Sequence, residues 1–117
     1  MTLFMTELAV ADFAASLAWY WDRLGLRVEV RDEPRRFALL AAPDGGRLAL
    51  KGGEPTPGGV TVHFQVADLA AALARLAAAG VSPVSPVRED TEGYRRAVLA
   101  DPDGYRVVVF EWVAGSG

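Results

Sequence analysis

The sequence contains one pattern twice, and this repetition constrains the fold more than any other feature of the chain. An alanine-rich stretch opens with Val10-Ala11-Asp12, and a second opens with Val66-Ala67-Asp68, 56 residues later. The tripeptide Pro43-Asp44-Gly45 returns as Pro102-Asp103-Gly104, 59 residues later. Two markers in the same order at nearly the same offset indicate two copies of one supersecondary unit, each too small to bury a core alone.

The repeat predicts the domain organisation. We interpret residues 1–117 as one domain, in which a first module at 1–51 and a second module at 60–117 flank a connector at 52–59. The connector holds four glycines and two prolines, a composition typical of a linker. The two modules pair either within one chain or by exchange between two subunits.

Each module is expected to have the order β-α-β-β-β. In the first module, apolar and polar residues alternate over 3–10, which predicts a strand. Asp12 is placed to cap a helix that Gly25 ends, and its apolar stripe is Phe13, Leu17, Trp21 and Leu24. The remaining expected elements are strands at 26–32, 36–41 and 47–51, then a strand at 60–66, a helix at 69–79 and strands near 82–88, at 94–100 and at 105–113. The fold class is α+β, with two tandem βαβββ modules whose curved mixed sheets surround a central cup.

Composition limits the classes of partner. Hydrophobic residues make up 51% of the chain, enough for the core of one soluble domain. The net charge is −3 and no run of basic residues exceeds two, so nucleic acid is not an expected partner. No apolar stretch approaches the roughly 20 residues that span a bilayer, so no membrane partner is expected. The absence of cysteine suits a cytoplasmic protein.

Strand alternation also predicts which side chains face the cup. The apolar faces of the strands should pack against the helices. The opposite faces should then enclose a ligand. The candidate ligand-binding residues on those opposite faces are Glu7, Arg47, Thr61, His63, Gln65, Arg106, Val108, Phe110 and Trp112.

Each candidate has a functional and a purely structural interpretation. Glu7 and His63 are repeat mates, so they could meet as an acid–base pair, or His63 could simply form hydrogen bonds inside a polar cup. Arg47 and Arg106 could hold an anionic group, or neutralise nearby carboxylates. Phe110 and Trp112 could form an aromatic wall for a planar ligand, or pack at an interface.

Three consecutive aromatic residues, Trp19-Tyr20-Trp21, cannot all face the core of one helix. We expect Trp21 to lie in the core, with Trp19 or Tyr20 toward the edge. An aromatic residue left outside, together with unpaired strand edges, favours a homodimer.

The paired βαβββ order, the Val-x-Asp helix entries and Asp101-Pro102-Asp103-Gly104-Tyr105 together resemble the vicinal oxygen chelate superfamily. That superfamily includes glyoxalase I, extradiol dioxygenases, and fosfomycin- and bleomycin-resistance proteins. The resemblance implies metal ligands at four positions, which this chain fills with Met5, Ala49, Thr61 and Val108. Neither a thioether, a lone hydroxyl nor a hydrocarbon suits a divalent cation at such a site, so no metal ligand and no cofactor are expected.

Two functional hypotheses follow. The first is a metal-free protein, similar to bleomycin-resistance proteins, that binds or sequesters a small planar or amphiphilic molecule in the cup. The alternative is a glyoxalase-like lyase, isomerase or dioxygenase that holds a divalent metal in a divergent way through Glu7 and His63. Glu111 is a poor additional ligand, because alternation places it on the helix side of its strand.

Overall fold

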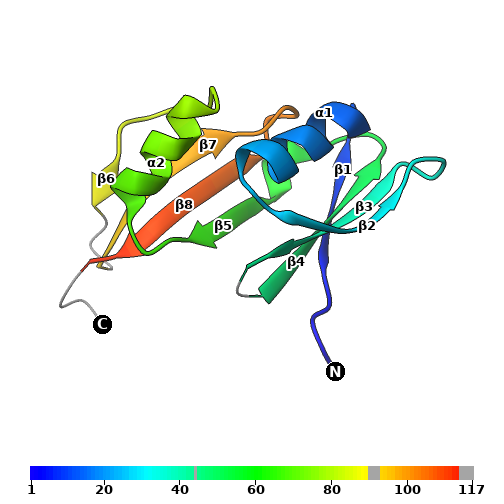
Figure 1. The fold of residues 1–117 in the computed structure, drawn as a ribbon, viewed down its shortest axis with the longest axis horizontal. Coiled ribbons are helices and arrows are strands. Elements are labelled where there is room, and N and C mark those ends of the chain that lie inside the picture. The colour runs from blue at the N-terminus through cyan, green and yellow to red at the C-terminus, as the bar shows by residue number, and fades with distance from the viewer. Residues whose placement is uncertain (44, 90–92, 114–117) are drawn as a thin grey trace. The chain divides into compact units, whose positions relative to one another are not determined.

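A computed structural model describes residues 1–43, 45–89 and 93–113 (Figure 1). The chain forms two compact units, Met1–Thr56 and Pro57–Gly117. Each unit contains one four-stranded mixed sheet and one main helix. The expected α+β class and the two βαβββ modules are confirmed. None of the helices in the described ranges is long and apolar enough to cross a membrane.

Unit 1 has the strand order β1-β4-β3-β2, in which β1 and β4 are parallel and the other neighbours are antiparallel. Its elements are β1 (Thr6–Val10), α1 (Phe13–Ala18), the π-helical turn η1 (Trp19–Arg23), β2 (Arg27–Asp32), β3 (Phe37–Ala42) and β4 (Gly45–Gly52). The first strand is shorter than the expected 3–10, since the ladder with β4 begins only at the pair Thr6 and Leu48.

Unit 2 repeats this arrangement with the strand order β5-β8-β7-β6, and β5 and β8 are its parallel pair. Its elements are the 3-10 turn η2 (Pro57–Gly59), β5 (Thr61–Gln65), α2 (Leu69–Ala78), β6 (Arg88–Glu89), β7 (Tyr94–Ala100) and β8 (Arg106–Trp112). The two modules therefore share one topology, as the sequence repeat predicts.

The helices begin where the sequence indicates. The carboxylates of Asp12 and Asp68 each accept a hydrogen bond of 3.0 Å, from the backbone N–H of Ala15 and Ala71 respectively. These bonds satisfy backbone donors that have no partner in the first helical turn.

The C-terminus of α2 is closed by Gly80, which has a φ of +85°. The N–H of Val81 donates to the carbonyl of Leu76 at 2.8 Å, and the N–H of Gly80 donates to the carbonyl of Ala77 at 3.0 Å. This pair of bonds is a Schellman motif, and its two apolar residues, Leu76 and Val81, are both buried.

The expected burial of Trp21 is wrong. Trp21 is 50% exposed, whereas Trp19 and Tyr20 are buried, with ring centroids 4.9 Å apart in an edge-on contact. In the π-helical turn, the N–H of Leu24 donates to the carbonyl of Trp19, five residues earlier. The buried stripe runs through Phe13, Leu17 and Tyr20, a spacing of four and three that is as helical as the one through Trp21.

The expected strand near 82–88 is also wrong for most of its length, because β6 contains only Arg88 and Glu89. Pro83 and Pro86 have no backbone N–H and cannot donate to a ladder. Between them, the N–H of Val84 donates to the carbonyl of Val98 at 2.8 Å. The segment therefore runs beside β7, but within the described part of the chain it forms one isolated backbone bond before Arg88, where a strand would form several.

Each sheet directs an apolar face toward its helix. In unit 1, α1 packs against β4, and Leu8, Val10, Leu48 and Leu50 are buried. In unit 2, α2 packs against β8, and Val107 and Val109 are buried. The strand registers pair Glu7 with Ala49 and His63 with Val108. Each pair lies on the face of its sheet that points away from the helix of the same unit. Strand alternation alone therefore predicted the faces correctly; a common cup between the sheets stays a prediction.

Candidate functional site

A pocket of about 160 Å³ lies in unit 2, lined by His63, Tyr94, Phe110 and Trp112. Three of these residues belong to the predicted set, and Tyr94 does not. The volume is close to that of a cavity of roughly 150 Å³ that accepts benzene, so the pocket has room for one aromatic ring.

The ladders of β8 with its two neighbours bring the four side chains together. Phe110 lies opposite Gln65 of β5 and opposite Arg96 of β7, and Trp112 lies opposite Tyr94. Residues two apart on one strand share a face, so Phe110 and Trp112 point to the same side as Tyr94 and His63. This side is the one opposite α2.

The pocket lining is an aromatic cluster with edge-on ring contacts. The centroid of Phe110 is 5.5 Å from that of Trp112, 5.7 Å from that of Tyr94 and 6.3 Å from that of His63. Tyr94 and Trp112 are 5.9 Å apart. Trp112 is 54% exposed, so part of its ring surface faces solvent. Such an arrangement offers apolar ring surface, with the Tyr94 hydroxyl, the Trp112 indole N–H and the His63 imidazole as polar groups.

Arg96 borders this cluster and was not among the predicted site residues. It pairs with Phe110 across the β7–β8 ladder and with Arg88 across the β6–β7 ladder. Its Nε atom is buried and has no hydrogen-bond partner among the described residues. Counting alternate residues along 94–100 places Arg96 on the same face as Tyr94, but only the register shows that Phe110 is its neighbour.

Other predicted residues of unit 2 lie on the same face but outside the pocket lining. Thr61 and Arg106 face each other at the start of β5 and β8, and both are exposed. Arg106 is four residues from Phe110 along β8, which corresponds to roughly 13 Å in a strand. Gln65 is exposed beside Phe110, and Val108 is fully buried.

Arg47 of unit 1 already has two partners. Its Nε donates to the carboxylate of Glu29 at 2.7 Å, and its guanidinium lies 5.2 Å from the ring centroid of Phe4. The hydrogen bonds from Arg47 and then Arg27 hold the pKa of Glu29 below its ordinary value. This agrees with the structural interpretation of Arg47, in which it neutralises a carboxylate. Glu7 lies opposite Ala49 and is exposed, and its meeting with His63 stays a prediction.

The four positions where the resemblance implies metal ligands do not fit a metal ion. Ala49 and Val108 are fully buried hydrocarbons, and Met5 and Thr61 offer one thioether and one hydroxyl. This donor set lacks the imidazole and carboxylate groups that bind divalent cations. Across residues 1–43, 45–89 and 93–113, no three side chains of the His, Asp and Glu types gather as a metal site.

Comparison with known proteins identifies the family of folds. Residues 2–109 match the model of the Glyoxalase/Bleomycin resistance protein/Dioxygenase superfamily. No curated protein matches this chain.

Solved structures show the same fold over nearly the whole chain. A glyoxalase/bleomycin resistance protein/dioxygenase from Nocardioides is 26% identical with a TM-score of 0.79, over 98% of this chain and 85% of its own. A glyoxalase/bleomycin resistance protein from Catenulispora acidiphila is 27% identical with a TM-score of 0.75, over 92% and 95%. TnmS3, an antibiotic binding protein from Streptomyces, is 22% identical with a TM-score of 0.80, over 96% of each chain.

Proposed function

This chain belongs to the Glyoxalase/Bleomycin resistance protein/Dioxygenase superfamily, and from that premise we propose that it binds a small planar or amphiphilic molecule without a metal ion. The observation that carries the proposal is the aromatic pocket of His63, Tyr94, Phe110 and Trp112 in unit 2. Concave, mainly apolar sites with a few polar groups are the usual form of small-molecule sites.

Two further observations support binding rather than metal-dependent catalysis. The positions at which the resemblance implies metal ligands carry side chains that do not suit a divalent cation. TnmS3, an antibiotic binding protein, has the same fold, so this fold is compatible with ligand capture. Thr61, Gln65 and Arg106, exposed on the same face of unit 2, are proposed as the outer part of the ligand site.

Trp112 and Trp21 allow a matched test of the pocket. Both are about half exposed, but only Trp112 lines the pocket. We expect benzamide to shift the amide resonances of β7 and β8 in a ¹H–¹⁵N NMR titration. Trp112→Ala should weaken this binding about fivefold to tenfold, because the ring of the ligand loses buried apolar area and its stacking contact with the indole. Trp21→Ala should leave the affinity unchanged. Equal affinities in the two variants, or shifts confined to unit 1, would show that the pocket is not the site.

Metal content separates the proposal from the alternative enzyme. We expect the purified protein, after incubation with zinc, nickel, manganese or iron(II) and desalting, to retain much less than one metal ion per chain in elemental analysis. The reason is that Met5, Ala49, Thr61 and Val108 supply no suitable donor set. Retention of one ion per chain, abolished by His63→Ala, would favour a divergent site through Glu7 and His63 and a lyase, isomerase or dioxygenase activity.

A homodimer in the cytoplasm completes the proposal. The exposed Trp21 and the edge strands at the ends of each sheet support self-association. We expect light scattering to give the mass of a dimer. A monomer mass at high micromolar concentration would refute the homodimer. The cytoplasmic location rests on the cysteine-free composition alone.

A further inference from the structure

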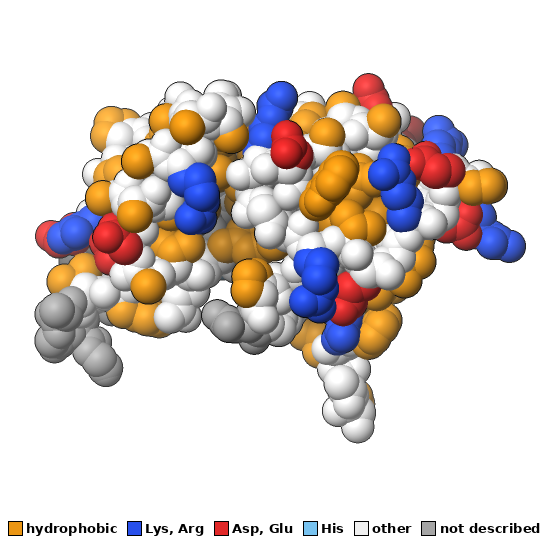
Figure 2. All heavy atoms as spheres, in the orientation of Figure 1, with side chains coloured by type: hydrophobic (Ala, Val, Ile, Leu, Met, Phe, Trp, Pro, Cys, Tyr) orange, Lys and Arg blue, Asp and Glu red, His pale blue; other side chains and the backbone are white. Residues whose placement is uncertain are grey.

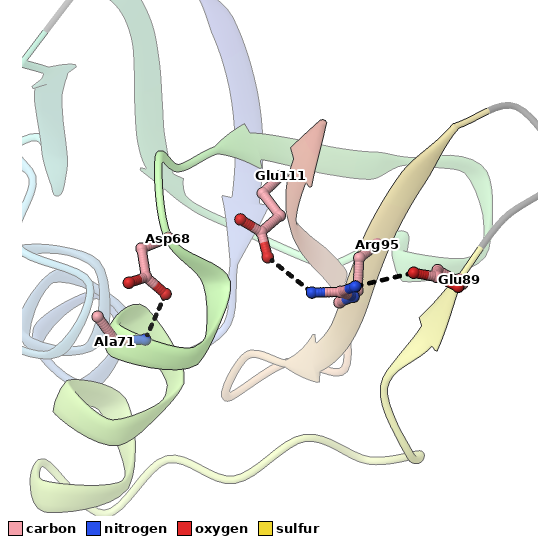
Figure 3. A network of polar contacts seen from close by, with 5 residues as sticks. All are labelled: Asp68, Ala71, Glu89, Arg95 and Glu111. Carbon is pink, nitrogen blue, oxygen red and sulfur yellow. Dashed lines mark hydrogen bonds and ion pairs between the residues drawn. The ribbon is translucent and has the colours of Figure 1, made fainter. Parts of the chain in front are cut away.

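The arginines on the two faces of the sheet in unit 2 differ in their charged neighbours. On the face that α2 covers, Arg95 lies between Glu89 at 2.8 Å and Glu111 at 3.3 Å (Figure 3). The hydrogen bond and charge of Glu89, and then those of Glu111, raise the pKa of Arg95. The cation on this face therefore has its counter-charges within the fold.

On the opposite face, the arginines form no ion pair with any residue that the structure describes. In β5, β6, β7 and β8, the residues whose alternation and register place them on this face include no aspartate or glutamate; they are Thr61, His63, Gln65, Arg88, Tyr94, Arg96, Val98, Ala100, Arg106, Val108, Phe110 and Trp112. Elsewhere, Arg27, Arg31, Arg35 and Arg47 form ion pairs with carboxylates, and Figure 2 shows several places where acidic and basic side chains lie next to each other on the face in view. Three arginines therefore share one face of the described strands with no carboxylate beside them.

Arg96 is the most informative of the three. Its neighbour in sequence, Arg95, forms two ion pairs, whereas the Nε of Arg96 is buried without a hydrogen-bond partner among the described residues. A buried donor left without an acceptor lowers the stability of the fold, and more so when the group is charged. An oxyanion that reaches the guanidinium of Arg96 would supply the side chain with an acceptor.

The position of Arg96 relates this unmet donor to the aromatic pocket. Arg96 and Phe110 are directly opposite each other in the β7–β8 ladder, and the Cβ atoms of such pairs lie roughly 5 Å apart. Arg88 faces Arg96 on its other side. A ring held against Phe110, Tyr94 and Trp112 would therefore have guanidinium groups beside it.

We propose that this site takes aromatic anions, in which one planar ring occupies the pocket and an attached oxyanion binds Arg96, with Arg88 as a second cation. The chemical class is a small aromatic carboxylate, sulfonate or phosphate. Guanidinium groups bind all three oxyanions through paired, charge-assisted hydrogen bonds. The inference rests on the proposed function, because it specifies the ligand of the same pocket.

A pair of isosteric probes tests the charge preference on the unmodified protein. Benzoate should bind about tenfold more tightly than benzamide, the difference that one hydrogen bond to a charged group produces. The carboxylate, but not the amide, should also shift the Nε–H resonance of the Arg96 side chain. Dissociation constants come from ¹H–¹⁵N NMR titrations of both probes at equal ionic strength.

Variants assign the preference to a residue. Arg96→Gln should reduce the preference for the carboxylate to less than twofold while the amide still binds. Arg75→Gln removes the same charge from the exposed surface of α2 and should retain the full preference. Arg96→Lys keeps a cation at this position and should retain part of the preference, and an unchanged amide spectrum verifies that each variant is folded.

The outcomes separate this inference from the proposed function. If both probes bind wild type with equal affinity, the pocket binds rings but the anion assignment is overturned. If neither probe binds, the proposed function itself fails. If Arg106→Gln removes the preference and Arg96→Gln retains it, the anion lies at the other end of β8 and the assignment to Arg96 is overturned.

Discussion

Tyr20→Ala is expected to lower the free energy of unfolding by about 3 to 5 kcal/mol, the usual range for removing a large aromatic side chain from a core. Tyr20 is fully buried and contacts Trp19 edge-on with 4.9 Å between ring centroids. Its removal leaves a cavity beneath the π-helical turn, which cannot collapse without breaking the turn's bonds. Chemical denaturation followed by circular dichroism measures the change.

Trp21→Ala is the internal control for this result. Trp21 follows Tyr20 directly in the chain but is half exposed, and a surface substitution usually changes stability by about 0.5 kcal/mol or less. A larger loss for Trp21→Ala than for Tyr20→Ala would contradict the burial of Tyr20 and would mean that the helix buries Trp21, as the sequence pattern predicts.

Asp101→Ala should be the second strongly destabilising substitution, at about 2 to 4 kcal/mol. Asp101 is buried, and its Oδ1 accepts hydrogen bonds of 2.9 Å from the backbone N–H groups of Asp103 and Tyr105. Alanine would leave two backbone donors in the β7–β8 turn without their acceptor, and each such loss costs roughly 1–3 kcal/mol. The turn also orients β8, which carries Phe110 and Trp112, so weaker probe binding should accompany the loss.

Two variants calibrate the Asp101 result. Asp101→Asn keeps an oxygen acceptor and should lose clearly less stability than Asp101→Ala. Asp68→Ala removes the N-cap of α2, a single exposed bond, and should cost about 1 kcal/mol. Thermal and urea unfolding of the three variants gives the order, and an Asp101→Ala variant no less stable than Asp68→Ala would contradict the role assigned to this carboxylate.

Much of the fold can be predicted from the sequence because it depends on local backbone chemistry. The caps at Asp12 and Asp68, the left-handed Gly80 and the turn at Gly104 depend on residues within a few positions of each other. Strand faces follow a period of two whatever the strand pairs with, so the placement of His63, Phe110 and Trp112 opposite the helix was predicted correctly. The repeat, seen in two copies, then indicates the topology.

The remaining features depend on contacts between residues far apart in sequence. A spacing of four and three describes a helical stripe through Tyr20 as well as one through Trp21, and only packing against the sheet of unit 1 chooses between them. Register likewise exists only once strands pair, and it is the register that sets Arg96 beside Phe110 while leaving Arg106 at the far end of β8. The sequence by itself determined the modules, their helix ends and their strand faces, because these follow from local backbone chemistry and periodicity. Only the tertiary structure decided which aromatic residue is buried and which arginine borders the pocket, because both depend on long-range packing.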